Sequence, residues 1–149
     1  MCNSIKFKEK PLISWQQLKN AYFSASTYRD LSADLSQRRR VKTSLRERRT
    51  LSRQVWCRKL WPEVYSTKIL AFLYDRIPQY SGLSAGKLRP GDDLEQDLSW
   101  TQICEFDWDM ALCDDFQAVF GYDISDSLIG AQFYTLEDLV RCLHQQVTG

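Results

Sequence analysis

Hydrophobic positions recur at helical spacing through the second half of the chain. Ile69, Phe72 or Leu73, and Ile77 form one stripe that ends near Pro78. A second arc at 3.6-residue spacing consists of Trp108, Leu112, Phe116, Val119 and Phe120. The third stripe consists of Leu136, Leu139, Val140 and Leu143. No alternating pattern of useful strand length interrupts these stripes, so the sequence predicts an all-α protein with a small bundle of three main helices.

The connections between these helices are also visible in the sequence. Residues 80–91 are rich in Gly, Pro and Ser and predict a long loop, followed by an acidic turn at 92–98 with Leu94 and Leu98 as apolar anchors. Gly121 stands where a left-handed residue ends the second helix. Residues 124–133 form a short link, and Thr135–Asp138 is a variant capping box that opens the last helix.

The first part of the chain is basic. Ser14–Gln17 fits a capping box, and the spacing of Trp15, Leu18 and Tyr22 predicts a short amphipathic helix. From Arg38 to Lys59, ten of twenty-two residues are Lys or Arg and one is acidic. Good helix formers favour a helix here, but like charges one turn apart oppose it, so we expect a helix that depends on an acidic partner and stops before Pro62. We therefore divide the chain into a basic helical N-terminal extension, residues 1–62, and a helical bundle, residues 63–149.

The charges of the two parts nearly cancel. Lys and Arg number 15 against 4 Asp and Glu in residues 1–60, net +11, and 5 against 15 in residues 61–149, net −10. This asymmetry predicts either pairing of the two parts, within one chain or between copies, or two surfaces for different partners. The predicted basic surface consists of Arg38, Arg39, Arg40, Lys42, Arg46, Arg48, Arg49 and Arg53. Nucleic-acid binding through segment 38–59 is an alternative, although no known DNA-reading fold surrounds it.

Other features limit the compartment and the chemistry. The longest apolar run, Ile69–Tyr74, has six residues, far below the roughly 20 that span a bilayer. The start of the chain lacks the apolar stretch of a secretory signal. The five cysteines form no C-x-x-C pair and accompany one histidine, His144, so we predict reduced thiols, no metal site and a cytoplasmic protein. Trp56 and Trp100 are either partner anchors or, by default, packed side chains.

The order of these features resembles an acyl carrier protein. The matching features are a helix, a long loop, the acidic turn at 92–98, an acidic helix ending in Phe120-Gly121, a link and the helix opened by Thr135–Asp138. Over about residues 63–147 the chain also resembles the uncharacterised enterobacterial acyl-carrier-like proteins of the DUF1493 type. The resemblance implies a bacterial protein with a four-helix carrier fold whose second helix docks on basic partner surfaces. The residues that this docking would use are Asp107, Asp109, Asp114 and Asp115.

The chain departs from that family at the modified residue. A working carrier attaches 4′-phosphopantetheine to a serine at the start of its second helix, and alignment back from Phe120-Gly121 puts Phe106 there. Because phenylalanine has no nucleophile, we predict no cofactor and no enzyme activity, but a protein-interaction or regulatory module. The alternative is a functional carrier modified at Ser99, which follows Asp97-Leu98. The literal Asp-Ser-Leu triplet at Ser127 lies in the link, where the family carries no prosthetic group.

Overall fold

The computed structural model describes residues 32–148. The helix predicted around Trp15 therefore lies outside the described residues. Between residues 32 and 148 the chain is helical and forms no β-strand, apart from one isolated bridge between Asp93 and Thr135. The prediction of an all-α bundle is confirmed. Among the described helices, none has the length and apolar character needed to cross a membrane.

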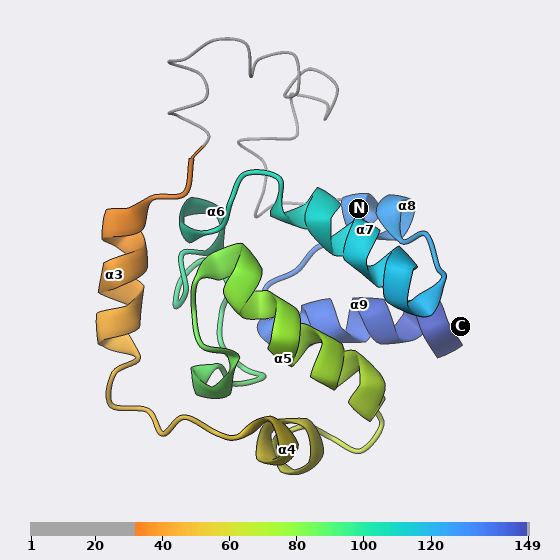
Figure 1. Ribbon diagram of the computed structural model, residues 1–149, viewed down its shortest axis with the longest axis horizontal. Helices are drawn as coiled ribbons and strands as arrows, with labels where there is room; N and C mark the ends of the chain where they lie inside the picture. The colour runs from red at the N-terminus through yellow and green to blue at the C-terminus, as the bar shows by residue number, and fades with distance from the viewer. Residues whose placement is uncertain (1–31, 149) are drawn as a thin grey trace, which may run out of the picture.

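Three long helices form the centre of the bundle. They are α5 (Thr67–Ser81), α7 (Trp108–Phe120) and α9 (Leu136–Thr148), and α5 contacts both of the others. The short helix α8 (Ser125–Gly130) packs on α7 (Figure 1). Leu73, Phe116 and Val140 belong to the buried core between them. The three stripes read from the sequence therefore face one another, as amphipathic helices must to bury their apolar sides.

Local signals place several helix ends correctly. Gly121 ends α7 with a φ of 81°, the left-handed conformation expected of it. The amide of Asp138 donates to the Thr135 hydroxyl at 3.2 Å, while the Asp138 carboxylate accepts from the Thr135 amide at 2.9 Å, which confirms the capping box. Helix α5 continues past the expected stop at Pro78 to Ser81, and Gly82 ends it with a φ of 76°.

Two details of the acidic helix and the link differ from the sequence interpretation. Val119 is 54% exposed rather than part of the buried arc, because Phe116 and Phe120 pack together with Phe72 on the neighbouring side of α7. The link at 124–133 is partly helical, since α8 occupies six of its residues. A helix this short has too few turns to produce a visible period in the sequence.

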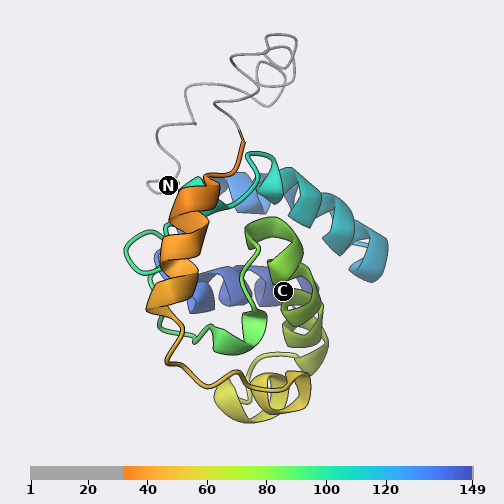
Figure 2. The same ribbon diagram turned by 60° about the vertical axis from the view of Figure 1, so that its left-hand side comes forward.

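The basic segment is not the single helix that the sequence predicts. Helix α3 (Leu35–Ser44) ends, residues 45–52 are non-helical, and α4 (Arg53–Val55) then continues into the π-helix η2 (Trp56–Leu60). The segment follows one side of the bundle and then passes beside α5 (Figure 2). The side chain of Ser52 accepts a hydrogen bond from the Val55 amide and so starts the second helix.

The long loop explains this break. The Leu51 amide donates to the carbonyl of Gly86 at 2.9 Å, and Lys87 Nζ donates to the carbonyls of Leu45 and Arg46. These backbone groups thus bond to the loop instead of to a continuing helix. Gly86 lies in the short 3₁₀-helix η3 (Ala85–Lys87), where a Cβ atom would come within 2.4 Å of the Leu51 carbonyl oxygen. The contact requires glycine at this position.

One buried core includes residues from both sides of residue 62. Val41 of α3 and Leu45 directly after it belong to the same hydrophobic cluster as α5, α7 and α9. Trp56 of η2 and Trp61 directly after η2 belong to it too. Neither Trp56 nor Trp100 is exposed, so both are packed side chains, and Trp56 Nε1 donates to the Leu88 carbonyl at 3.0 Å. The division of the chain at residue 62 stays a prediction.

Candidate partner-binding groove between α7 and α8

Helices α7 and α8 enclose a surface hollow of about 200 Å³, which we call the α7–α8 groove. Its lining residues are Asp109, Met110, Cys113, Asp114, Ser125, Leu128 and Ile129. Asp109 and Cys113 are four residues apart on α7, as are Met110 and Asp114, so the two pairs share one side of this helix. The groove therefore joins carboxylates on α7 to apolar side chains on both helices.

The structure separates the four acidic residues that the sequence singled out. Asp109 and Asp114 line the groove. Asp115 instead accepts a hydrogen bond from the Tyr80 hydroxyl at 2.7 Å and lies 3.9 Å from the Arg76 guanidinium, both on α5. Asp107 stands at the N-cap of α7, where its side chain makes no capping hydrogen bond. Asp115 is thus engaged within the bundle, and the groove contains the other two carboxylates of α7.

Sequence reasoning missed the apolar part of the groove. Ile129 is 61% exposed on α8, and Leu128 beside it is buried. Because the sequence indicates only a link at 124–133, neither could be placed opposite α7. Met110 lies outside the core stripe of Trp108, Leu112 and Phe116 on α7. An apolar side chain at such a position was the signal in the sequence that this side of the helix faces something other than the core.

Cys113 is poorly suited to nucleophilic chemistry in the groove. Burial raises the pKa of its thiol to about 12, and the carboxylate of Asp109 acts in the same direction. The nucleophilic form of cysteine is the thiolate, so at neutral pH this side chain remains protonated. Its contribution to the groove is that of a small apolar group.

The serines considered for phosphopantetheine attachment lie elsewhere. Ser99 precedes the short helix α6 (Trp100–Ile103), has a left-handed φ of 51°, and its half-buried hydroxyl accepts a hydrogen bond from Gln37 Nε2 of α3 at 2.9 Å. The Ser127 hydroxyl, on α8, donates to Gln146 Oε1 at 2.9 Å. Phe106, just before α7, is buried with 9% of its surface exposed.

Part of the predicted basic surface is neutralised inside the molecule. Arg48 pairs with Asp92, Arg53 pairs with Asp75, and Arg38 donates to the Ile103 carbonyl and lies 3.6 Å from Glu105. The other predicted residues, all exposed, are Arg39, Arg40, Lys42, Arg46 and Arg49, of which Arg46 lies 3.8 Å from the Glu47 carboxylate. The exposed positive charge of this predicted surface is therefore concentrated on α3 and the turn that follows it.

Within residues 32–148, no three His, Cys, Asp or Glu side chains come together as metal ligands would. Among known proteins, no family model, curated protein or solved structure matches the chain.

Proposed function

We propose that this chain is a non-enzymatic protein-interaction module that docks on a basic partner surface through the α7–α8 groove. The observation that carries this proposal is that Asp109 and Asp114 share one hollow with Met110, Leu128 and the exposed Ile129. Asp114 is exposed and Asp109 is half-buried. Carboxylates at a surface steer and orient a positively charged partner, whereas apolar side chains that lose water supply most of the affinity. The matching partner presents an apolar side chain flanked by Lys or Arg.

The resemblance to acyl carrier proteins supports this proposal. Helices α5, α7, α8 and α9, with the four-residue helix α6 between the first two, occur in an order compatible with a four-helix carrier, in which the acidic helix α7 would be the second helix. The buried Phe106 at the expected attachment position supports a carrier-like module without a prosthetic group. The hydrogen bond from Gln37 to Ser99 supports the same proposal, because attachment of phosphopantetheine at that hydroxyl would displace it and crowd α3.

Intact mass tests the alternative of a true carrier. The full chain is co-expressed with a phosphopantetheinyl transferase, together with the Ser99→Ala variant. We expect an unmodified mass for both proteins. A gain of one phosphopantetheine arm by the original chain that is lost in Ser99→Ala would overturn the proposal in favour of a functional carrier.

A defined peptide tests the docking groove. The probe is a synthetic amphipathic helix with Lys and Arg beside a Leu stripe, titrated into ¹⁵N-labelled full chain and compared with a Glu-substituted version of the same peptide. We expect the basic peptide to shift the amide signals of α7 and α8 and to bind more weakly as salt increases. The acidic peptide should leave these signals unchanged.

Charge-neutral variants complete the test. Asp109→Asn with Asp114→Asn should weaken binding of the basic peptide by about fivefold at low salt, the size expected for two ion pairs at a protein surface. The matched control neutralises Glu47 and Glu63, two exposed carboxylates that do not line the groove, and should leave the affinity within about twofold. Equal losses in both variants, or shifts centred outside α7 and α8, contradict the proposal.

A further inference from the structure

A second hollow lies on a different part of the surface, between the α4–η2 segment and the first turns of α5. Its volume is about 450 Å³, and we call it the basic hollow. It is lined by Arg53, Gln54, Cys57, Arg58, Thr67, Lys68 and Ala71. Three of these side chains are cations and none is a carboxylate. The basic hollow shares no lining residue with the α7–α8 groove.

The local helical geometry gathers these side chains. Arg53, Gln54, Cys57 and Arg58 follow the spacing i, i+1, i+4 and i+5, which places them on one side of the α4–η2 segment. The opposite side is fixed in the core by Trp56, which is fully buried and bonded to the Leu88 carbonyl. η2 is a π-helix. This conformation is rare in proteins as a whole, but where it occurs it often lies at a functional site.

The three cations differ in how far they are neutralised. Arg53 donates from Nε and Nη2 to the Asp75 carboxylate at 3.0 and 2.9 Å, which holds its guanidinium in place. Arg58 and Lys68 are exposed, and neither side chain forms an ion pair or hydrogen bond with any residue from 32 to 148. The hollow therefore contains positive charge that the described part of the chain leaves unbalanced.

We propose that the basic hollow binds the phosphate group of a small phosphorylated molecule. Arg58 presents a planar set of N–H donors that matches phosphate oxygens, Lys68 adds a compact charge, and the Thr67 hydroxyl and Gln54 amide add neutral donors. The hollow exceeds the size of one phosphate ion and falls within the roughly 300–1,000 Å³ of small-molecule sites. A polynucleotide fits less well, because it requires a row of cations along several phosphates.

Titration with inorganic pyrophosphate tests this site in the full chain. Calorimetry is performed at constant ionic strength, with sodium chloride replaced stepwise by pyrophosphate. We expect saturable binding with one site per chain and, in ¹⁵N spectra, signal changes at residues 57, 58, 67 and 68. Inorganic phosphate should bind at the same site more weakly, because it carries fewer oxygens and less charge.

Paired variants distinguish specific binding in the basic hollow from non-specific electrostatic attraction of anions. Arg58→Gln with Lys68→Gln should weaken pyrophosphate binding by about tenfold. Arg39→Gln with Lys42→Gln removes the same charge from exposed positions of α3 and should leave the affinity within about twofold. All four side chains are exposed, and circular dichroism verifies that each variant is folded.

Three results would overturn the proposal. The first is the absence of saturable pyrophosphate binding at low salt. The second is an equal loss of affinity in the two paired variants. The third is tight binding of an unrelated DNA duplex that is lost in Arg58→Gln with Lys68→Gln, since this would assign the positive charge of the basic hollow to nucleic-acid contact.

Discussion

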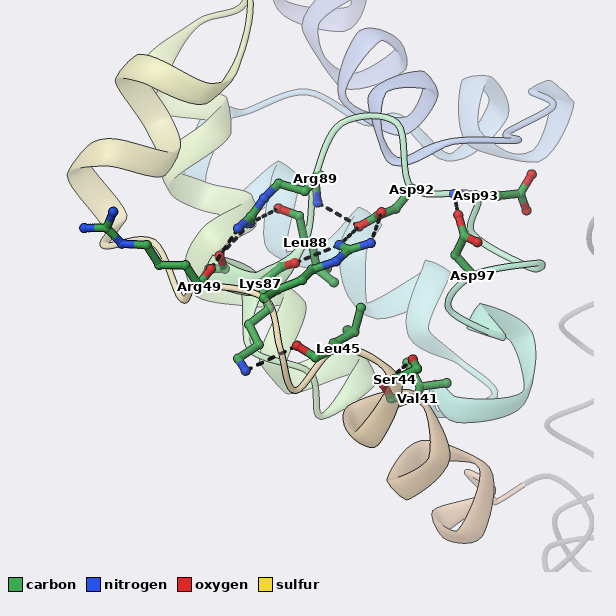
Figure 3. Close-up of polar contacts among 12 residues, drawn as sticks. Val41, Ser44, Leu45, Arg49, Lys87, Leu88, Arg89, Asp92, Asp93 and Asp97 are labelled. Carbon is green, nitrogen blue, oxygen red and sulfur yellow. Dashed lines mark hydrogen bonds and ion pairs between the residues drawn. The ribbon is translucent and has the colours of Figure 1, made fainter.

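The ion pair between Arg48 and Asp92 joins the basic segment to the long loop, and its removal is the sharpest test of how this fold is held together. Arg48 donates to both carboxylate oxygens of Asp92, at 2.7 and 2.8 Å, and to the Lys87 carbonyl at 2.9 Å. Asp92 also accepts from the Arg89 amide at 2.7 Å, and its own carbonyl accepts from the first amide of α9. Figure 3 shows this loop, with Lys87 turned back to the Leu45 carbonyl.

The burial of the two side chains sets the expected magnitude. Asp92 is 6% exposed and Arg48 is 32% exposed. Removal of one partner from a fully buried pair costs about 3–5 kcal/mol, because the other charge remains unpaired away from water. Arg48 is partly solvated and Asp92 keeps the Arg89 amide, so we expect Arg48→Met to lower the free energy of unfolding by about 2–3 kcal/mol.

The chain supplies a matched control. Arg53 contacts Asp75 with the same two-pronged geometry, but the side chains are 56% and 51% exposed. Urea unfolding followed by circular dichroism should show a clear fall in stability for Arg48→Met and a much smaller change for Arg53→Met. Adding Asp92→Asn to Arg48→Met should restore part of the loss, since it removes the unpaired charge. Similar effects of the two single variants would refute the reasoning.

Three further predictions concern pH, close packing and thiol reactivity. Burial, with the hydrogen bond to Asp115, raises the pKa of Tyr80 above its usual value. The protonated Tyr80 hydroxyl therefore contributes its full stability below the unfolded pKa of about 10, and this contribution is lost as the pH rises through the folded pKa. Chemical unfolding between pH 9 and 11 should show a shallower alkaline loss for Tyr80→Phe, and an unchanged slope would contradict this assignment. Gly86→Ala should cost about 1–3 kcal/mol because its Cβ meets the Leu51 carbonyl, whereas Gly91→Ala, with open space around it, should be near neutral in the same urea assay. Burial raises the pKa values of Cys113 and Cys142 to about 12 and about 11, so mass spectrometry should find both alkylated slowly by iodoacetamide at pH 8 in the folded protein and rapidly in urea; fast native labelling would show that they are accessible.

Much of the bundle follows from local sequence signals. The inward stripes of α5, α7 and α9, the left-handed Gly121 and the Thr135 capping box each depend on residues within a few positions of one another. Such features follow from the helical period and from the unpaired backbone groups at helix ends, which are the same wherever the segment lies in the fold. The excess of basic residues before residue 60 and of acidic residues after it is likewise a property of the sequence alone.

The tertiary structure decided which of those residues act together. Residues 45–52 leave the helix because the loop around Gly86 and Lys87 bonds to their backbone, a contact across about 40 residues that no local period reveals. Asp115 turns to Tyr80 on α5, whereas Asp114 next to it lines the groove with Ile129. Asp114 and Asp115 are adjacent in α7, but they have different surroundings because their side chains face different packed helices. The sequence by itself determined the helices and the charge they carry, but their packing determined which charges are neutralised and which remain at the surface for a partner.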